Sequence, residues 1–137
     1  MIFLSCDLIS KFVVWKFLPL YKSVKILGNL IRITHIENPG MVFGLPIPQK
    51  SIFLVLSFAV VLFLIFLSVK KGGILIPMIT AGAIGNFVDR LWKGTVTDFI
   101  DIGVKSWRYP TFNLADSFIT VGLIILILKS LKGGGHG

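Results

Sequence analysis

IFLVLSFAVVLFLIFLSV, the stretch at residues 52–69, contains no charged residue and is followed directly by Lys70-Lys71-Gly72-Gly73. Crossing a hydrocarbon core about 30 Å thick takes roughly 20 helical residues, so this stretch predicts a membrane-spanning helix that ends in a tight turn. Apolar stretches at 2–20, 74–89 and 114–131 predict three more spans. The expected fold class is therefore all-α integral membrane, with four transmembrane helices.

The composition supports one membrane domain over residues 1–137. Apolar residues make up 55% of the 137 positions, charged residues make up 15%, and the mean hydropathy is +0.90. A soluble domain of this size carries more charge and less apolar surface. Four spans with their connections use the whole chain, so a second domain has no room. The Gly-rich tail at 133–137 is predicted to be disordered.

Two connecting segments have the alternating pattern of β-strands. Residues 30–36 alternate apolar and polar side chains before a turn signal at Asn38-Pro39-Gly40, and residues 95–102 form a second β-prone run. Four alternating spans place both segments on one side of the membrane. We therefore expect a small extramembrane β element there, on the same side as the candidate site described below.

The basic charge has a membrane explanation. The net charge is +8, but the basic residues flank apolar segments instead of alternating with aromatic ones as a strand-binding surface requires. This placement predicts contact with phospholipid headgroups and no nucleic acid. One cysteine, Cys6, and two scattered histidines exclude an internal disulfide and predict no metal site.

The acidic residues are few and lie in or beside apolar segments. Five of the six are aspartates: Asp7, Asp89, Asp98, Asp101 and Asp116. A carboxylate at the centre of a span costs roughly 2.5 to 3.5 kcal/mol, so each needs a partner, a wet cavity or a function. In the four-span arrangement the last four gather at one membrane face. Asp7 and Lys11 lie on one helical face and are expected to pair.

The pattern Asn-x-x-Asp occurs twice, at Asn86/Asp89 and at Asn113/Asp116. Side chains three residues apart share a helix face and can orient one another. Each pair can also be read as a simple helix cap. Two pairs at one membrane face, with Asp98 between them, favour a functional site.

Carboxylates without a suitable histidine partner suggest acid–base chemistry by an aspartate pair. Two carboxylates a few ångströms apart share a proton at neutral pH, so one can activate water while the other protonates a scissile carbonyl. Such a reaction needs no metal and no organic cofactor. Asp116 is one candidate, and the pattern alone leaves Asp89 and Asp98 open as its partner.

Several motifs, in this order along almost the whole chain, resemble those of bacterial lipoprotein signal peptidase, the type II signal peptidase. They are the Asp7/Lys11 pair, Asn38-Pro39-Gly40-Met41-Val42-Phe43-Gly44, Gly82-Ala83-Ile84-Gly85-Asn86-Phe87-Val88-Asp89-Arg90-Leu91, Val96-Thr97-Asp98-Phe99-Ile100-Asp101 and Phe112-Asn113-Leu114-Ala115-Asp116-Ser117.

The resemblance implies an aspartic endopeptidase of the bacterial cytoplasmic (inner) membrane with its active site near the outer face. It would remove signal peptides from diacylglyceryl-modified prolipoproteins, cutting just before the lipid-modified cysteine. The resemblance assigns catalysis to Asp98 and Asp116 and a structural pairing to Asp7 and Lys11. Supporting or substrate-contacting roles fall to Asn38, Gly40, Asn86, Asp89, Arg90, Asn113 and Ala115. We expect a monomer.

The lysines and arginines favour the opposite topology. With the active site outside, the loops on that side carry eight basic residues: Lys22, Lys25, Arg32, Lys50, Arg90, Lys93, Lys105 and Arg108. Basic residues usually collect on the cytoplasmic side. We follow the resemblance and expect part of this charge to pair with the aspartates.

Two other function classes stay open at this point. A proton or ion translocator would use buried aspartates as relay stations, distributed across the depth of the membrane. A non-catalytic membrane subunit would use its polar residues to hold helices together.

Overall fold

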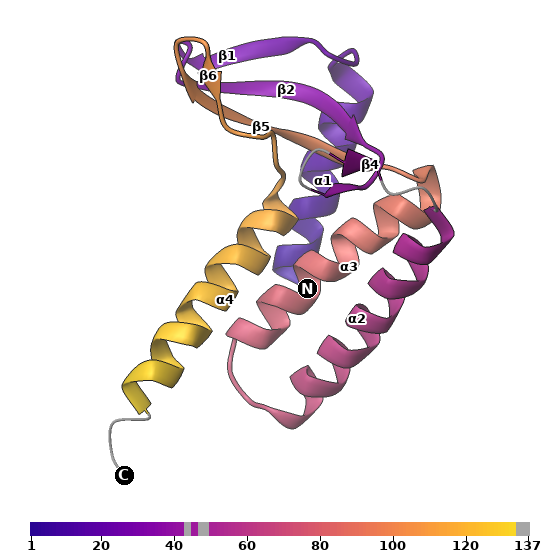
Figure 1. Ribbon diagram of the computed structural model, residues 1–137, viewed down its shortest axis with the longest axis vertical. Helices are drawn as coiled ribbons and strands as arrows, with labels where there is room; N and C mark the ends of the chain where they lie inside the picture. Colours follow the sequence, from indigo (N-terminus) through magenta and orange to yellow (C-terminus); the bar gives the residue numbers. More distant parts are fainter. Residues whose placement is uncertain (43–44, 47–49, 134–137) are drawn as a thin grey trace.

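The computed structural model describes residues 1–42, 45–46 and 50–133, and the side chains of residues 1–40 and 51–133. The described elements, in chain order, are α1 (Ile2–Phe17), β1 (Ser23–Leu27), β2 (Ile31–Asn38), β3 (Met41–Val42), β4 (Leu45–Pro46), α2 (Lys50–Lys70), α3 (Leu75–Lys93), β5 (Val96–Val104), β6 (Trp107–Arg108) and α4 (Leu114–Gly133). Figure 1 shows the helices at one end of the molecule and the main sheet at the other.

Helix α3 lies at the centre of the helical part, between α2 and α4, and also contacts α1 (Figure 1). Glycines allow these close approaches. A Cβ on Gly82 would lie 2.6 Å from the backbone oxygen of Ala115 in α4, and one on Gly85 would overlap the carboxylate of Asp7 in α1. Small residues at such positions let helix backbones approach where packing drives association.

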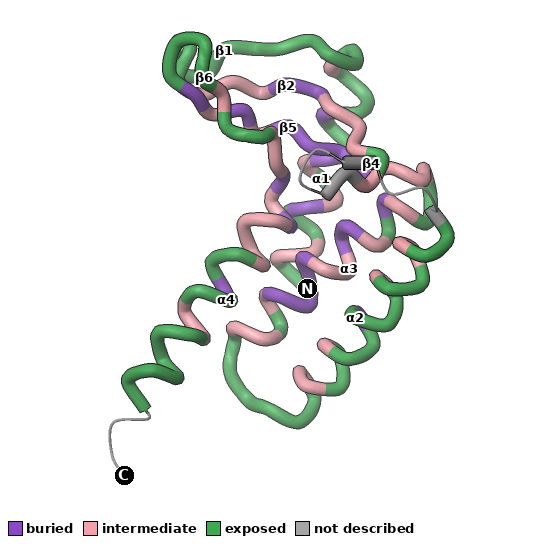
Figure 2. Tube along the Cα trace, viewed as in Figure 1, coloured by how far each residue is buried: buried purple, intermediate pink, exposed green. Residues whose placement is uncertain are grey.

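The distribution of burial is the reverse of that in a soluble protein. Polar groups such as Asp7, Lys11 and Asn113 are almost fully buried, while α2 and the far half of α4 are largely exposed along apolar surfaces (Figure 2). Two of the described helices, α2 and α4, are long and apolar enough to cross a membrane. The apolar outer surface and polar interior fit a membrane protein.

The main sheet in the described chain is antiparallel, with strand order β1-β2-β5-β6. Its two central strands confirm the β element predicted near 30–36 and 95–102. The register pairs Ile36 with Asp98 and Asn38 with Val96, after an irregularity between Ile33 and Ile36. The strand pairing therefore fixes the position of Asp98 relative to β2. Strands β3 and β4 form a separate short ribbon.

The helix boundaries differ from the predicted spans for local reasons. Helix α1 ends at Phe17, short of the predicted residue 20, because Leu18 is extended and Pro19 follows it. Helix α3 continues past the predicted residue 89 to Lys93, where Gly94 adopts φ 75° and closes the helix with a hydrogen bond to Arg90. The predicted tail disorder at 133–137 falls almost wholly on residues 134–137, which lie outside the described residues.

Replacing Gly85 with Ala should destabilise the fold, because the added Cβ would overlap the carboxylate of Asp7. Overpacking of this kind costs about 1 to 3 kcal/mol. Thermal unfolding in detergent micelles should show a lower Tm for Gly85→Ala. Gly72→Ala is the matched control, since nothing lies within 4 Å of a Cβ there. Equal Tm values for the two variants would contradict this packing of α1 against α3.

Candidate active site

The site is organised by Asn113, a fully buried residue directly before α4. The side-chain oxygen of Asn113 accepts a hydrogen bond from the backbone N–H of Asp116 at 2.9 Å, and the backbone N–H of Asn113 donates to Asp116 Oδ2 at 3.2 Å. This reciprocal pairing is the geometry of a helix capping box. The cap reading of the second Asn-x-x-Asp is therefore correct, and the same contacts fix the orientation of the Asp116 carboxylate.

The side-chain amide of Asn113 reaches Asp98 as well. Its Nδ2 lies 2.9 Å from Asp98 Oδ1, 3.1 Å from Asn86 Oδ1 and 3.2 Å from the backbone oxygen of Thr97. Asn86 Nδ2 in turn donates to Asp116 Oδ1 at 3.0 Å. Hydrogen bonds through two asparagines therefore join Asp98 on β5 to Asp116 on α4.

Asp98 is the more deeply buried carboxyl of the two, at 4% exposed. Burial and, after it, the negative charge of Asp116 raise the pKa of Asp98 to about 7, against the opposing effects of hydrogen bonds from Asn38 and Asn113 and of the positive charge of Lys11. Asn38 Nδ2 donates to Asp98 Oδ2 at 3.2 Å. Near neutral pH this carboxyl is therefore able to hold a proton.

Asp89 has a different environment. Its Oδ2 accepts the backbone N–H of Thr97 at 2.9 Å and lies 3.7 Å from both Lys11 Nζ and Lys93 Nζ. Two ammonium groups therefore compensate its charge. These contacts favour a structural role for Asp89 and leave Asp98 as the partner of Asp116, a choice that the Asn-x-x-Asp pattern did not decide.

The predicted Asp7–Lys11 pair is present, with Nζ 2.6 Å from Oδ2 and both residues buried. It is tied to the site at two points: Asp7 Oδ1 accepts the backbone N–H of Ala115 at 2.8 Å, and Lys11 Nζ donates to Asn86 Oδ1 at 2.9 Å. The pair thus joins α1 to the first turn of α4 and to α3. Ala115 contributes its backbone, and its side chain is fully buried.

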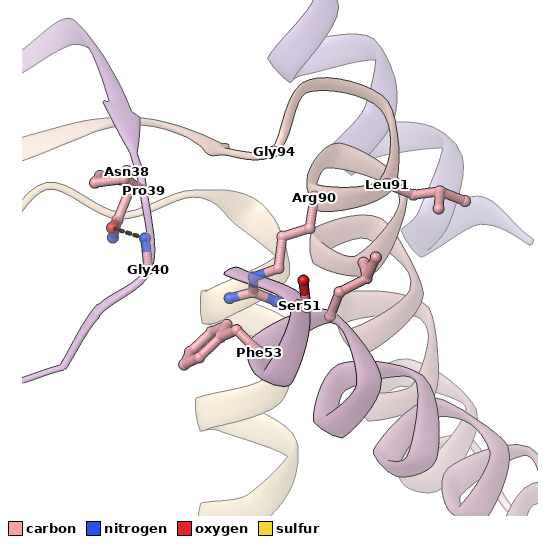
Figure 3. A pocket seen from close by; sticks show the side chains of 9 residues that line it. Asn38, Pro39, Gly40, Ser51, Phe53, Arg90, Leu91 and Gly94 are labelled. Carbon is pink, nitrogen blue, oxygen red and sulfur yellow. Dashed lines mark hydrogen bonds between the residues drawn. The ribbon is translucent and has the colours of Figure 1, made fainter. Parts of the chain in front are cut away.

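Arg90 and Gly40 border a cavity beside these groups. The cavity has a volume of about 260 Å³, and its lining includes Asn38, Gly40, Phe53 and Arg90. Figure 3 shows the Arg90 side chain extended toward Phe53, whose ring centroid lies 4.7 Å from the guanidinium carbon. Gly40 has φ 94° and donates its N–H to Asn38 Oδ1 at 3.0 Å, which closes the predicted turn.

A second cavity, of about 380 Å³, lies between α2, α3 and α4. Most of its lining is apolar, including Leu56, Val60 and Ile119, while Ser57, Asn86 and Arg90 contribute its polar groups. Because Asn86 donates to Asp116, this cavity reaches from an apolar helix surface to a residue in direct contact with that carboxylate.

Sequence reasoning assigned no role to Glu37, the one glutamate in the chain. Its carboxylate accepts hydrogen bonds from His35 at 3.0 Å, Thr97 at 2.8 Å, Thr95 at 2.6 Å and Lys93 at 3.1 Å. Burial alone would raise the pKa of Glu37, but these donors lower it to about 2. The cluster clamps β2 to the start of β5, one residue from Asp98. The one sequence feature that pointed to a role for Glu37 was its position next to Asn38.

Asp101 lies apart from the site. Its oxygens are 2.9 Å from Arg32 Nη2 and 2.8 Å from Arg108 Nη2, and it accepts a hydrogen bond from Thr34 at 2.8 Å. It therefore ties strands β2, β5 and β6 together, and the expectation that loop bases pair with aspartates is confirmed here. Within the described ranges, no three His, Cys, Asp or Glu side chains are grouped so as to hold a metal ion.

Glu37→Gln should lower stability in a pH-dependent way. The folded-state pKa of Glu37 is about 2 and its ordinary value is 4.5, so its carboxylate stabilises the fold above about pH 4.5, and this contribution is lost as the pH falls toward 2. The difference in Tm between wild type and Glu37→Gln should be largest above pH 5 and shrink in acid. A difference that stays constant from pH 6 to the acid limit of folding would contradict this assignment.

The chain is similar to known proteins over nearly its whole length. Residues 1–132 match the family model described as signal peptidase (SPase) II. A bacterial membrane enzyme whose structure was solved by the in meso method at 2.3 Å resolution matches with a TM-score of 0.87 and 27% identity, covering 98% of this chain and 85% of that one. A second such structure, at 1.9 Å resolution, gives a TM-score of 0.84 and 28% identity over 96% and 88% of the two chains. The chain therefore belongs to the signal peptidase II family of aspartic-type membrane peptidases.

Proposed function

We propose that the chain removes signal peptides from diacylglyceryl-modified prolipoproteins, cutting on the N-terminal side of the lipid-modified cysteine, with Asp98 and Asp116 as its catalytic pair. The observation that carries the catalytic assignment is the asparagine bridge: Asn113 donates to Asp98 while Asn86 donates to Asp116. A buried carboxyl, Asp98, and a half-buried one, Asp116, both accept hydrogen bonds from Asn113, an arrangement that suits a pair sharing one proton.

In the proposed reaction, one carboxylate of the pair takes a proton from water as the water oxygen attacks the scissile carbonyl carbon. The protonated partner gives its proton to the carbonyl oxygen, so a neutral tetrahedral intermediate forms. When the intermediate collapses, the C–N bond breaks, the carboxyl group that took the proton from water passes it to the leaving amine, and one hydroxyl group of the intermediate returns its proton to the other carboxylate, which restores the pair. The raised pKa of Asp98 makes it the proton donor in the first step, with Asp116 as the base. No cofactor takes part.

The two cavities support a substrate path from the bilayer. The larger one has an apolar lining between α2 and α4 that suits an apolar signal-peptide segment, and it leads to Asn86 beside Asp116. The smaller one places Asn38, Gly40 and Arg90 next to Asp98 through the Asn38–Asp98 hydrogen bond. We assign the binding of substrate and the positioning of the catalytic pair to these residues together with Asn86, Asn113 and Ala115. We assign to Asp89 the compensation of the lysine charges beside the site.

We further propose that all four helices span the bacterial cytoplasmic membrane, with the site near its outer face and the protein acting as a monomer among phospholipids. Helices α1 and α3 contain charged residues, but Asp7, Lys11 and Asp89 are buried, whereas the outward residues Ile9, Val13 and Leu91 are apolar and exposed. Charges that compensate one another inside a bundle are compatible with a span.

The distribution of acidic groups argues against an ion translocator. The described part of α2 from residue 51 to 69 contains no ionisable side chain, and neither does α4 from 117 to 128. Asp98 and Asp116 instead accept hydrogen bonds from Asn113 and Asn86 at the sheet end of the helices. Lys11, which donates to Asn86, lies beside Asp7 and Asp89. A relay would need stations at other depths. A purely structural subunit would explain the Asp7–Lys11 pair but not two carboxyl groups that share a bridge beside a cavity.

Asp98→Asn and Asp116→Asn should each lower cleavage of a diacylglyceryl-modified prolipoprotein by roughly 10²- to 10⁴-fold or more, because each removes an acid–base group. Purified protein in detergent or vesicles and a gel assay for signal-peptide loss provide the measurement. Asp101→Asn is the matched control on the same strand and should retain turnover of the same order. Wild-type turnover in either dyad variant, with folding verified by Tm, would refute the catalytic assignment.

The pH dependence of kcat/KM should show an alkaline limb with an apparent pKa near 7. Because the folded-state pKa of Asp98 is raised to about 7, the proton it donates is present below this pH and is lost above it. The rate should fall about tenfold per pH unit beyond the limb. A rate that stays level from pH 6 to pH 9 would exclude Asp98 as the proton donor.

A further inference from the structure

The main sheet has one polar face and one apolar face. Directly opposed residues in an antiparallel ladder point to the same side. The pairs Lys25↔Arg32 and Arg32↔Asp101 therefore define a polar face, and the pairs Ile33↔Ile100 and Val104↔Trp107 define the other. The remaining members of this apolar face, assigned in the same way, are Val24, Leu27, Ile31 and Ile102.

The apolar face is only partly covered: its central isoleucines are half-buried, but its outer residues are exposed. Trp107, Val104 and Val24 on the apolar face are 66%, 59% and 51% exposed, whereas Asp101 on the polar face is 4% exposed beneath its two arginines. Tyr109, two residues after Trp107, is also exposed. A partly covered apolar sheet face with exposed aromatic side chains at its edge is a binding surface that the proposed peptidase reaction does not use.

The alternation along β5 shows which way this face points. Asp98, Ile100, Ile102 and Val104 alternate with Thr97, Phe99 and Asp101, so Asp98 shares the apolar face. Asp98 meets Asn113 at the head of α4, so this face lies on the helix side of the sheet. In Figure 1 the sheet projects sideways past the upper end of α4. The apolar face of the sheet is therefore directed toward the plane that contains the upper ends of the apolar helices, where these helices would leave the membrane.

The charge around the sheet is strongly positive. Residues 21–34 and 99–109 contain five basic residues and one acidic residue, for a net charge of +4. Lys22, Lys25 and Lys105 are exposed and form no ion pair within the described ranges, while Arg32 and Arg108 share Asp101. Basic side chains next to an apolar face with tryptophan and tyrosine are the signature of a segment that lies in the bilayer interface.

We propose that the sheet of β1, β2, β5 and β6 lies in the headgroup layer of an anionic phospholipid bilayer, with its apolar face toward the acyl chains and its lysines among the anionic headgroups. This explains why basic residues collect on the side that the positive-inside pattern disfavours: they bind lipid. It also ties the depth of the sheet to that of Asp98, which lies on the same face of β5.

The test uses tryptophan quenching in the full-length protein reconstituted in vesicles of phosphatidylcholine with phosphatidylglycerol. Brominated acyl chains are placed on one lipid or the other, and wild type is compared with Trp107→Phe so that the difference reports Trp107 alone. We expect loss of Trp107 emission with brominated lipid, greater for brominated phosphatidylglycerol. Lys25→Gln with Lys105→Gln should lower this preference by up to about fivefold per lysine.

Two outcomes would overturn the proposal. Trp107 emission that is quenched by aqueous iodide and unaffected by brominated lipid would place the sheet in water. Equal quenching by both brominated lipids, unchanged in the double lysine variant, would remove its anionic selectivity. A nitroxide on Val104→Cys in a Cys6→Ser background measures depth independently if Trp107→Phe folds poorly. Neither readout depends on cleavage, so failure here and failure of the Asp98–Asp116 assignment are distinguishable.

Discussion

A carboxylate buried inside a protein must find its hydrogen-bond partners there, because no water reaches it. Asn113 is where this constraint is met. It is fully buried, it caps α4 through Asp116, and its amide reaches Asp98, Asn86 and the Thr97 carbonyl. Because a single side chain contacts α3, α4 and β5, the positions of these three elements depend on one another.

The rest of the fold maintains this junction. Gly85 lets α1 approach α3 closely enough for Lys11 to reach Asn86. On the other side, Glu37 ties Thr97 to β2 in the register that presents Asn38 to Asp98. A one-residue slip of a strand would turn its side chains to the opposite face. Polar contacts inside the protein thus fix the geometry of this junction, whereas the outer surface of the helices is apolar.

Local sequence patterns predicted the features that depend on neighbouring residues. The apolar runs predicted the helices, the spacing of four predicted the Asp7–Lys11 pair, and Asn-x-x-Asp predicted the Asn113–Asp116 contact. Features that depend on distant residues were predicted less well. The Glu37 cluster was missed because it forms only when β2 meets the end of α3. For Asp101 the sequence indicated pairing of aspartates with loop bases but not the partners, because Arg32 and Arg108 reach Asp101 only when β2, β5 and β6 pair. Neither has a local spacing that a sequence could display.

If Asp98 and Asp116 form the catalytic pair, the charge of Asp116 must act on the Asp98 carboxyl. The most direct measurement is a pH titration of the Asp98 carboxyl, by infrared or NMR spectroscopy of the protein labelled with ¹³C-aspartate and assigned with Asp98→Asn, in wild type and in Asp116→Asn. We expect a midpoint near 7 in wild type and a lower midpoint in Asp116→Asn, because the neighbouring negative charge is gone. The same midpoint in both proteins would contradict the assignment of this pair.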